Sequence, residues 1–170
     1  MNTRLKYLSA IAGASLLAAC GGSDAPPPAD DTPATTSETA DAGDTAEAAA
    51  PTADSTDTLD GTTLASFTPD VAHGEQVFAQ CQTCHVLEEG VNRVGPSLAG
   101  IVGRAAGTVD GFNYTPANAN SGITWTPEKM FQYLENPARV VPGTKMAFAG
   151  LPEGQDRADV IAYLQGAGAQ

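Results

Sequence analysis

The chain has 170 residues, with 20 acidic and 8 basic side chains and a formal charge of −12. This balance excludes a nucleic-acid-binding protein, because no basic patch can be assembled to follow a phosphate backbone. Residues 21–66 hold ten acidic and no basic residues, whereas residues 67–170 hold ten acidic and six basic ones. Nine of the ten aromatic residues lie at or beyond Phe67. The core must therefore be built from residues 67–170.

Residues 1–20 have the pattern of a secretory signal, in which Arg4 and Lys6 precede an apolar run that ends in small residues. The apolar run is shorter than the roughly 20 residues of a membrane-spanning helix. Its end, Leu17-Ala18-Ala19-Cys20, resembles the lipobox of bacterial lipoproteins. That resemblance implies acylation of Cys20 and a lipid anchor in a membrane. The alternatives are a cleaved signal without lipid and an uncleaved helical anchor.

Residues 21–66 contain no aromatic residue, and Leu59 and Leu64 are the only large aliphatic ones. Such a segment cannot bury enough apolar surface to offset the entropy of ordering. We therefore expect a disordered acidic tether, rich in Ala, Thr and Pro, that connects the anchor to one domain at residues 67–170.

Three segments of that domain carry helix signals. Thr68-Pro69 starts the first, with proline at the first helical position. Thr126-Pro127 starts the second, and Pro137 stops it. The third runs near Gln155–Leu164. No segment alternates like a strand, so the sequence predicts an all-α fold whose Gly/Pro-rich loops wrap a bulky group.

Cys81-Gln82-Thr83-Cys84-His85 is the strongest chemical signal, because C-x-x-C-H is the pattern of c-type haem attachment. The two thiols can each add to one vinyl group of a haem, and the adjacent imidazole can then bind the iron. A thioredoxin-like redox pair would need a βαβ setting that is not visible here. A zinc site would need a second ligand pair, and His73 is the only other histidine.

The second axial ligand has four kinds of candidate: His73, Met130, Met146 and a lysine. His73 is too near Cys81 to reach the opposite face of the haem, and Met130 fits the apolar stripe of the second helix. Met146 lies in a Pro/Gly-rich loop that lets its sulfur point toward the iron. We therefore predict Met146, a thioether that favours reduced iron opposite histidine.

Residues 67–166 resemble a class I cytochrome c of the mitochondrial type. Beyond the haem motif, the resemblance rests on Gly95-Pro96-Ser97-Leu98-Ala99-Gly100, Gly103-Arg104, Gly111-Phe112-Asn113-Tyr114-Thr115, Gly122-Ile123-Thr124-Trp125, Tyr133-Leu134-Glu135-Asn136-Pro137, Pro142-Gly143-Thr144-Lys145-Met146, Phe148-Ala149-Gly150 and Arg157-Ala158-Asp159-Val160-Ile161-Ala162-Tyr163-Leu164. It implies a small fold of three to five helices around a single haem c, held covalently by Cys81 and Cys84.

The resemblance also implies roles for individual side chains. The carbonyl of Pro96 is expected to accept the free N–H of His85. Tyr163 is expected to meet Gly74 and Phe78 where the first and last helices cross. The haem propionates are expected to be held by Arg104, Tyr114 and Trp125. A polar network near the Met146 sulfur is expected to consist of Tyr133, Thr144 and Asn118.

By the same resemblance the protein is a monomeric one-electron carrier and not an enzyme. Its expected partners are a quinol–cytochrome c oxidoreductase (the bc-type complex) and a terminal cytochrome c oxidase, or a photosynthetic reaction centre. These partners favour the periplasmic face of the inner membrane over the outer membrane. The domain departs from the mitochondrial pattern in having only two lysines, Lys129 and Lys145. The alternative function is a haem enzyme or a sensor of gas or peroxide with a labile distal Met146.

Overall fold

The computed structural model describes residues 49–167. The predicted signal, the predicted acylation site Cys20 and most of the predicted tether lie outside these residues. Between residues 49 and 167, no helix is both long enough and apolar enough to cross a membrane.

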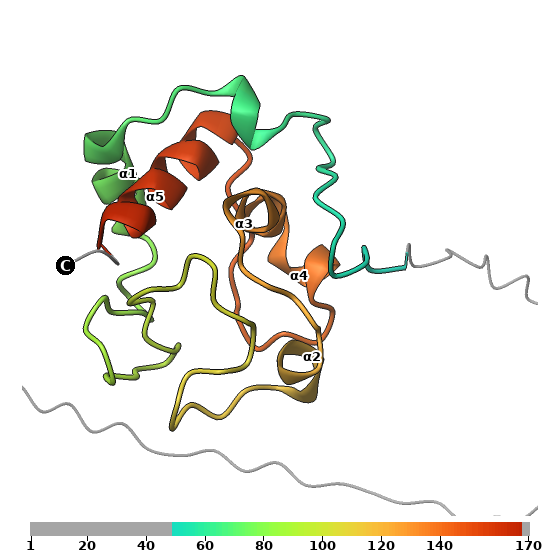
Figure 1. Cartoon of the computed structure of the whole chain (residues 1–170), viewed down its shortest axis with the longest axis vertical. Helices are drawn as coiled ribbons and strands as arrows, with labels where there is room; N and C mark the ends of the chain where they lie inside the picture. Colours follow the sequence, from blue (N-terminus) through green and yellow to red (C-terminus); the bar gives the residue numbers. More distant parts are fainter. Residues whose placement is uncertain (1–48, 168–170) are drawn as a thin grey trace, which may run out of the picture. The chain divides into compact units, whose positions relative to one another are not determined.

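The described residues form helices joined by long loops, without a strand; within them, only an isolated bridge between Ala105 and Thr124 has sheet-like pairing. This confirms the predicted all-α fold. The elements in chain order are η1 (Leu64–Ser66), α1 (Val71–Phe78), α2 (Pro116–Ala119), α3 (Pro127–Glu135), α4 (Pro137–Val140) and α5 (Gly154–Ala167) (Figure 1).

Side-chain caps fix where the helices begin. The hydroxyl of Thr126 accepts the backbone N–H of Lys129, and α3 starts at Pro127 as predicted. The prediction that the first helix starts at Pro69 is wrong, because α1 starts at Val71. Asp70 is its cap: the carboxylate accepts two helix N–H groups, and the residue itself is extended with φ of −113°.

The close crossing of α1 and α5 organises the domain (Figure 1). A Cβ atom added to Gly74 would lie 2.1 Å from the backbone oxygen of Asp159, so the helices touch through backbone at this point. The rings of Phe78 and Tyr163 pack with centroids 5.3 Å apart. The contacts predicted among Gly74, Phe78 and Tyr163 are therefore present.

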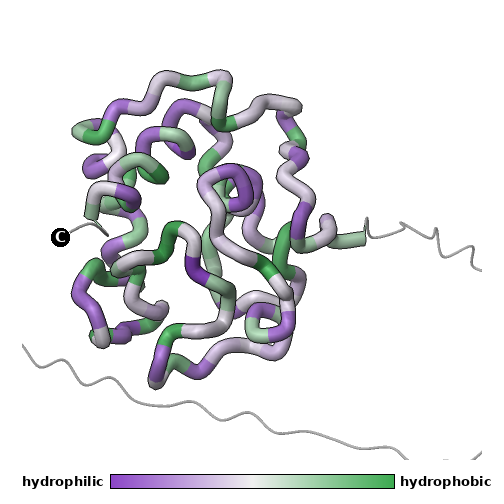
Figure 2. The backbone as a smooth tube through the Cα atoms, in the orientation of Figure 1, coloured by the Kyte–Doolittle hydropathy of each residue, from purple (hydrophilic) through white to green (hydrophobic). Residues whose placement is uncertain are grey.

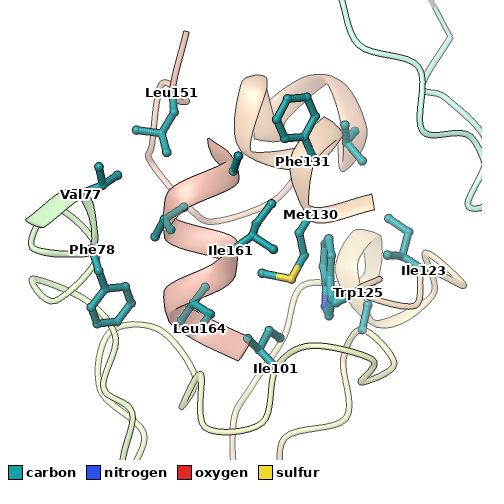
Figure 3. Packing of buried hydrophobic residues seen from close by; sticks show 14 of the residues in the cluster. Val77, Phe78, Ile101, Ile123, Trp125, Met130, Phe131, Leu151, Ile161 and Leu164 are labelled. Carbon is teal, nitrogen blue, oxygen red and sulfur yellow. The ribbon is translucent and has the colours of Figure 1, made fainter. Parts of the chain in front are cut away.

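The core collects apolar side chains from α1, α3, α4, α5 and the loops that join them (Figure 3). In Figure 2 hydrophobic and hydrophilic residues are interspersed along α5, and the five consecutive residues 157–161 are all buried, so this turn of the helix is enclosed by the domain on every side. The buried core residues are Val77, Phe78, Ile101, Ala106, Ile123, Trp125, Met130, Phe131, Val140, Val141, Leu151, Ala158, Val160, Ile161 and Leu164.

The prediction of a disordered tether over residues 21–66 is wrong for residues 49–66. In the structure this segment passes α4 and α3 and reaches α5 through η1 (Figure 1). We call residues 51–62 the N-terminal strap. The strap has few apolar side chains, but its backbone groups bind polar side chains of the helices, for example the Lys129 ammonium and the Glu135 carboxylate. Composition alone does not reveal such bonds.

Candidate haem site

The two cysteines of the C-x-x-C-H motif lie in the turns that follow α1. Backbone N–H groups of Cys81 and Cys84 donate to the carbonyls three residues earlier, at 2.8 and 3.1 Å. The N–H of His85 donates to the carbonyl of Cys81 at 2.9 Å. This tight winding brings both thiols and the imidazole to the wall of one cavity. Both thiols are free, and burial, together with the nearby Cys84, raises the pKa of the Cys81 thiol to about 11.

His85 is oriented by its other ring nitrogen. Its Nδ1 lies 2.8 Å from the carbonyl oxygen of Pro96, so this nitrogen donates and Nε2 remains free for a metal. Gly95 makes room for the ring: a Cβ atom at this position would lie 2.3 Å from His85 Cε1. A loop that closes over the imidazole this tightly holds one orientation of the ring.

The cavity has a volume of about 310 Å³ and is lined mostly by apolar atoms. Trp125, Met130 and Leu164 point into it from three different segments (Figure 3). This apolar lining suits the faces of a porphyrin, and the free thiols suit its attachment. Its lining residues are Gln80, Cys81, Thr83, Cys84, His85, Val94, Gly95, Pro96, Leu98, Ile101, Arg104, Phe112, Tyr114, Thr115, Asn118, Trp125, Met130, Tyr133, Leu134, Thr144, Lys145, Met146, Ala147, Phe148, Val160 and Leu164.

Met146 also lies on the cavity wall, in the loop between α4 and α5. The hydroxyl of Tyr133 on α3 donates to its sulfur at 3.7 Å. The backbone N–H of Met146 donates to the hydroxyl of Thr144 at 3.3 Å. Burial raises the pKa of Tyr133 to about 12, so the phenol stays protonated as a donor at neutral pH. Two members of the predicted polar network thus contact Met146 directly.

Asn118, the third member, has a buried side-chain oxygen without a hydrogen-bond partner among residues 49–167. Buried polar atoms are nearly always paired. Asn118 also lines the cavity, and its unpaired oxygen is an acceptor that a donor group or an ordered water would satisfy.

The three residues predicted to hold propionates all line the cavity. The guanidinium of Arg104 donates to the carbonyls of Ala99 and Ser97, at 2.8 and 2.9 Å. Burial lowers the pKa of Arg104 and raises that of Tyr114. A buried cation beside a phenol can hold carboxylates.

Leu98, Ile101, Val160 and Leu164 also line the cavity, and no sequence motif marks them as cavity residues. They are ordinary apolar residues whose position at the cavity becomes known only when the helices and loops are placed. The ion pair between His73 and Asp159, with Nδ1 and Oδ2 2.8 Å apart, also has no signal in the sequence.

Residues 71–168 match the cytochrome c family. The chain belongs to the cytochrome c family. Over 97 residues it is 50% identical to cytochrome c2 of Rhodopila globiformis. The aligned residues make up 56% of this chain and 92% of that protein. It is 52% identical to cytochrome c2 of Blastochloris viridis over 97 residues, 56% of this chain and 76% of that protein.

Among solved structures, the chain resembles cytochrome cH from Methylobacterium extorquens, at 43% identity and a TM-score of 0.54. The similarity covers 57% of this chain and 98% of that one. As a cytochrome c, the protein is an electron carrier and not an enzyme. Its cofactor is haem c, bound covalently through Cys81 and Cys84.

Proposed function

We propose that this cytochrome c is a membrane-tethered one-electron carrier with a haem iron that is closed on both faces by His85 and Met146. The observation that supports it best is that both side chains line the same cavity, each with its own hydrogen-bond partner: Pro96 for the imidazole and Tyr133 for the thioether. Iron with two protein ligands has no open position for a substrate, and a His/Met pair gives a high reduction potential.

The other cavity residues would hold the cofactor and limit its reorganisation. Arg104, Tyr114 and Trp125 lie where they could bind the propionates, and Asn118 and Thr144 would complete the polar network beside Met146. The haem supplies the reversible change of iron between its ferric and ferrous forms. The chain contributes a packed apolar shell that would exclude water from most of the surface of the haem.

We place the protein on the periplasmic face of a bacterial membrane, anchored through a lipid on Cys20. We propose as partners a bc-type quinol–cytochrome c oxidoreductase as donor and a terminal oxidase as acceptor, with a photosynthetic reaction centre as an alternative partner. These complexes lie in the inner membrane, which we favour for the anchor. A tether would keep the domain at high effective concentration near them.

The first test is the visible spectrum of the matured protein, oxidised and reduced, with carbon monoxide added to the reduced form. We expect a low-spin c-type spectrum, a ferric methionine–iron charge-transfer band and no shift with carbon monoxide. A missing band, or rapid binding of carbon monoxide, would instead support a haem enzyme or a gas or peroxide sensor.

Replacement of the distal ligand gives a sharper form of this test. The variant Met146→Ala should lose the charge-transfer band and bind carbon monoxide, and its reduction potential should fall, because a neutral thioether ligand is removed. Met130→Leu is the matched control, since Met130 also lines the cavity but packs in the core. If Met130→Leu lost the band and Met146→Ala kept it, the ligand assignment would be reversed.

A further inference from the structure

The N-terminal strap binds polar side chains on the face of α3 that points away from the haem cavity. The ammonium of Lys129 donates to the carbonyls of Thr52 and Ser55, at 3.1 and 2.9 Å. The side-chain amide of Gln132 donates to the carbonyl of Asp57 at 2.8 Å. Lys129 and Gln132 are almost completely buried. The strap is therefore packed on the domain although it lies outside residues 71–168, which the family accounts for.

The second half of the strap closes an ionic cluster between α3 and α5. Backbone N–H groups of Leu59 and Asp60 donate to the two carboxylate oxygens of Glu135, at 2.6 and 3.0 Å. The guanidinium of Arg157 on α5 donates to the carboxylate of Asp60 at 2.5 Å and to the hydroxyl of Thr62 at 3.3 Å. Charge-assisted bonds of this kind are stronger than neutral ones.

Arg157 connects this cluster to the loop that carries Met146. Its side chain is fully buried and donates to the carbonyls of Leu151 and Pro152, at 3.0 and 3.1 Å. The loop is also fastened to the end of α3. The N–H of Leu151 donates to the carbonyl of Leu134 at 2.7 Å, and Gly150, with φ of 105°, packs on the carbonyl of Glu135. The end of the segment from Met146 to Leu151 is therefore fixed by contacts with Arg157 and with the end of α3.

Helix α3 lies between the strap and the cavity. One face carries Lys129 and Gln132, which bind the strap, and the other carries Met130, Tyr133 and Leu134, which line the cavity. Tyr133 is the residue whose hydroxyl donates to the Met146 sulfur. The strap can therefore affect Met146 by two routes, through α3 and through Arg157.

We propose that the strap stabilises the haem site. In this proposal Asp60 is a positioning residue for Met146, because its carboxylate holds Arg157 against the end of the loop that carries Met146. This inference deepens the proposed function and rests on Met146 being the distal ligand. Without the Asp60 carboxylate, Arg157 keeps its carbonyl contacts but loses its closest counter-charge, with Glu135 remaining at 3.8 Å. The end of the Met146 loop then becomes easier to release.

The experiment compares the full-length holoprotein with Asp60→Ala, Asp60→Glu and the matched control Asp54→Ala. Asp54 is exposed in the same strap, so its replacement removes the same charge from the same segment. Three signals are followed: the ferric methionine–iron band on heating, the far-ultraviolet helical signal on the same samples, and the hydrogen exchange of the Leu59 and Asp60 amides.

In Asp60→Ala we expect the band to disappear at a temperature lower by about 5 °C or more, while the helical signal persists. We also expect carbon monoxide to bind the reduced form several-fold faster, and the two amides to exchange faster. Asp60→Glu should restore part of each effect, and Asp54→Ala should behave like the unsubstituted protein.

Two results would overturn the inference while leaving the proposed function intact: a band in Asp60→Ala as stable as in Asp54→Ala, or a band and helical signal that are lost together at one lower temperature. The second result would mean that the strap contributes only to global stability. Absence of the band in the unsubstituted protein would instead reject Met146 as the ligand, and the inference with it.

Discussion

At the scale of single residues, the site depends on side chains whose rotation is restricted by a neighbouring residue. The His85 imidazole is held between the Pro96 carbonyl and the backbone of Gly95. The Met146 thioether is held by Tyr133 and by its own backbone bond to Thr144. As the proposed ligands of the iron, these two side chains would keep the same geometry in both of its oxidation states. This would lower the reorganisation that electron transfer requires.

His73 is the residue whose charge we expect to depend on pH near neutrality. The hydrogen bond to Asp159 raises the pKa of His73, and the charges of Asp156, Asp159 and Asp70 add to the effect. The protonated form is the one that is stabilised. The contribution to stability is therefore complete below the unfolded pKa of about 6.5 and is lost as the pH rises through the folded value.

Nuclear magnetic resonance titration should accordingly show His73 titrating above pH 6.5. Urea unfolding between pH 5.5 and 8.5 should show that the advantage of the unsubstituted protein over His73→Gln shrinks as the pH rises. A stability difference that is constant with pH, or one that grows toward pH 8.5, would contradict this assignment.

At the scale of elements, the crossing of α1 and α5 allows no side chain at Gly74. A Cβ atom there would lie 2.1 Å from the carbonyl oxygen of Asp159 and 3.0 Å from Cβ of Tyr163. Since neither neighbour is the flexible end of a side chain, the helices must separate. We predict that Gly74→Ala lowers the free energy of unfolding by about 1–3 kcal/mol.

Urea unfolding of the holoprotein measures this effect. The control is Gly166→Ala, because the same methyl group on α5 would meet nothing within 4 Å. An alanine in a helix is more favourable than a glycine, so the control should be as stable as the unsubstituted protein or more stable. Equal stability of the two variants would show that the crossing is looser than the structure indicates.

Elements that are determined by neighbouring residues could be predicted from the sequence, whereas elements that depend on residues far apart in the chain could not. The attachment turn at Cys81 and Cys84 and the start of α3 at Pro127 were predictable, because covalent chemistry and capping act over a few residues. The strap was not, since Asp57 and Gln132 are far apart in the chain and meet through a backbone carbonyl. The start of α1 was missed because Pro69 was a strong local signal, whereas Asp70 is fixed partly by Asp159 on α5.

At the scale of the whole molecule, the charge is distributed away from the region through which electrons would pass. The exposed residues on the cavity wall are Gln80, Thr83, Val94, Lys145 and Ala147, and only Lys145 is charged. Its ammonium donates to the carbonyl of Asn113 and lies over the ring of Phe112. Three more of the domain's six basic residues, Lys129, Arg139 and Arg157, are bound to the strap.

A surface with so little free positive charge cannot rely on electrostatic steering to an acidic partner, whose rate would fall steeply with salt. The proposed anchor supplies a different route to fast encounter, through high effective concentration at the membrane. We therefore predict that electron transfer from the full-length protein to a terminal oxidase in the same membrane depends only weakly on salt.

Membrane vesicles that contain the oxidase and either the full-length protein or Cys20→Ser allow a direct measurement of both effects. The anchored protein should keep most of its rate when salt is raised from about 20 to 200 mM, over which the Debye length shortens several-fold. Cys20→Ser should be released from the vesicles and transfer electrons more slowly at equal total concentration, again with little salt dependence. A steep loss of rate with salt in both proteins would show that charge steers the encounter after all. Equal rates for the two proteins would show that the anchor contributes nothing to it.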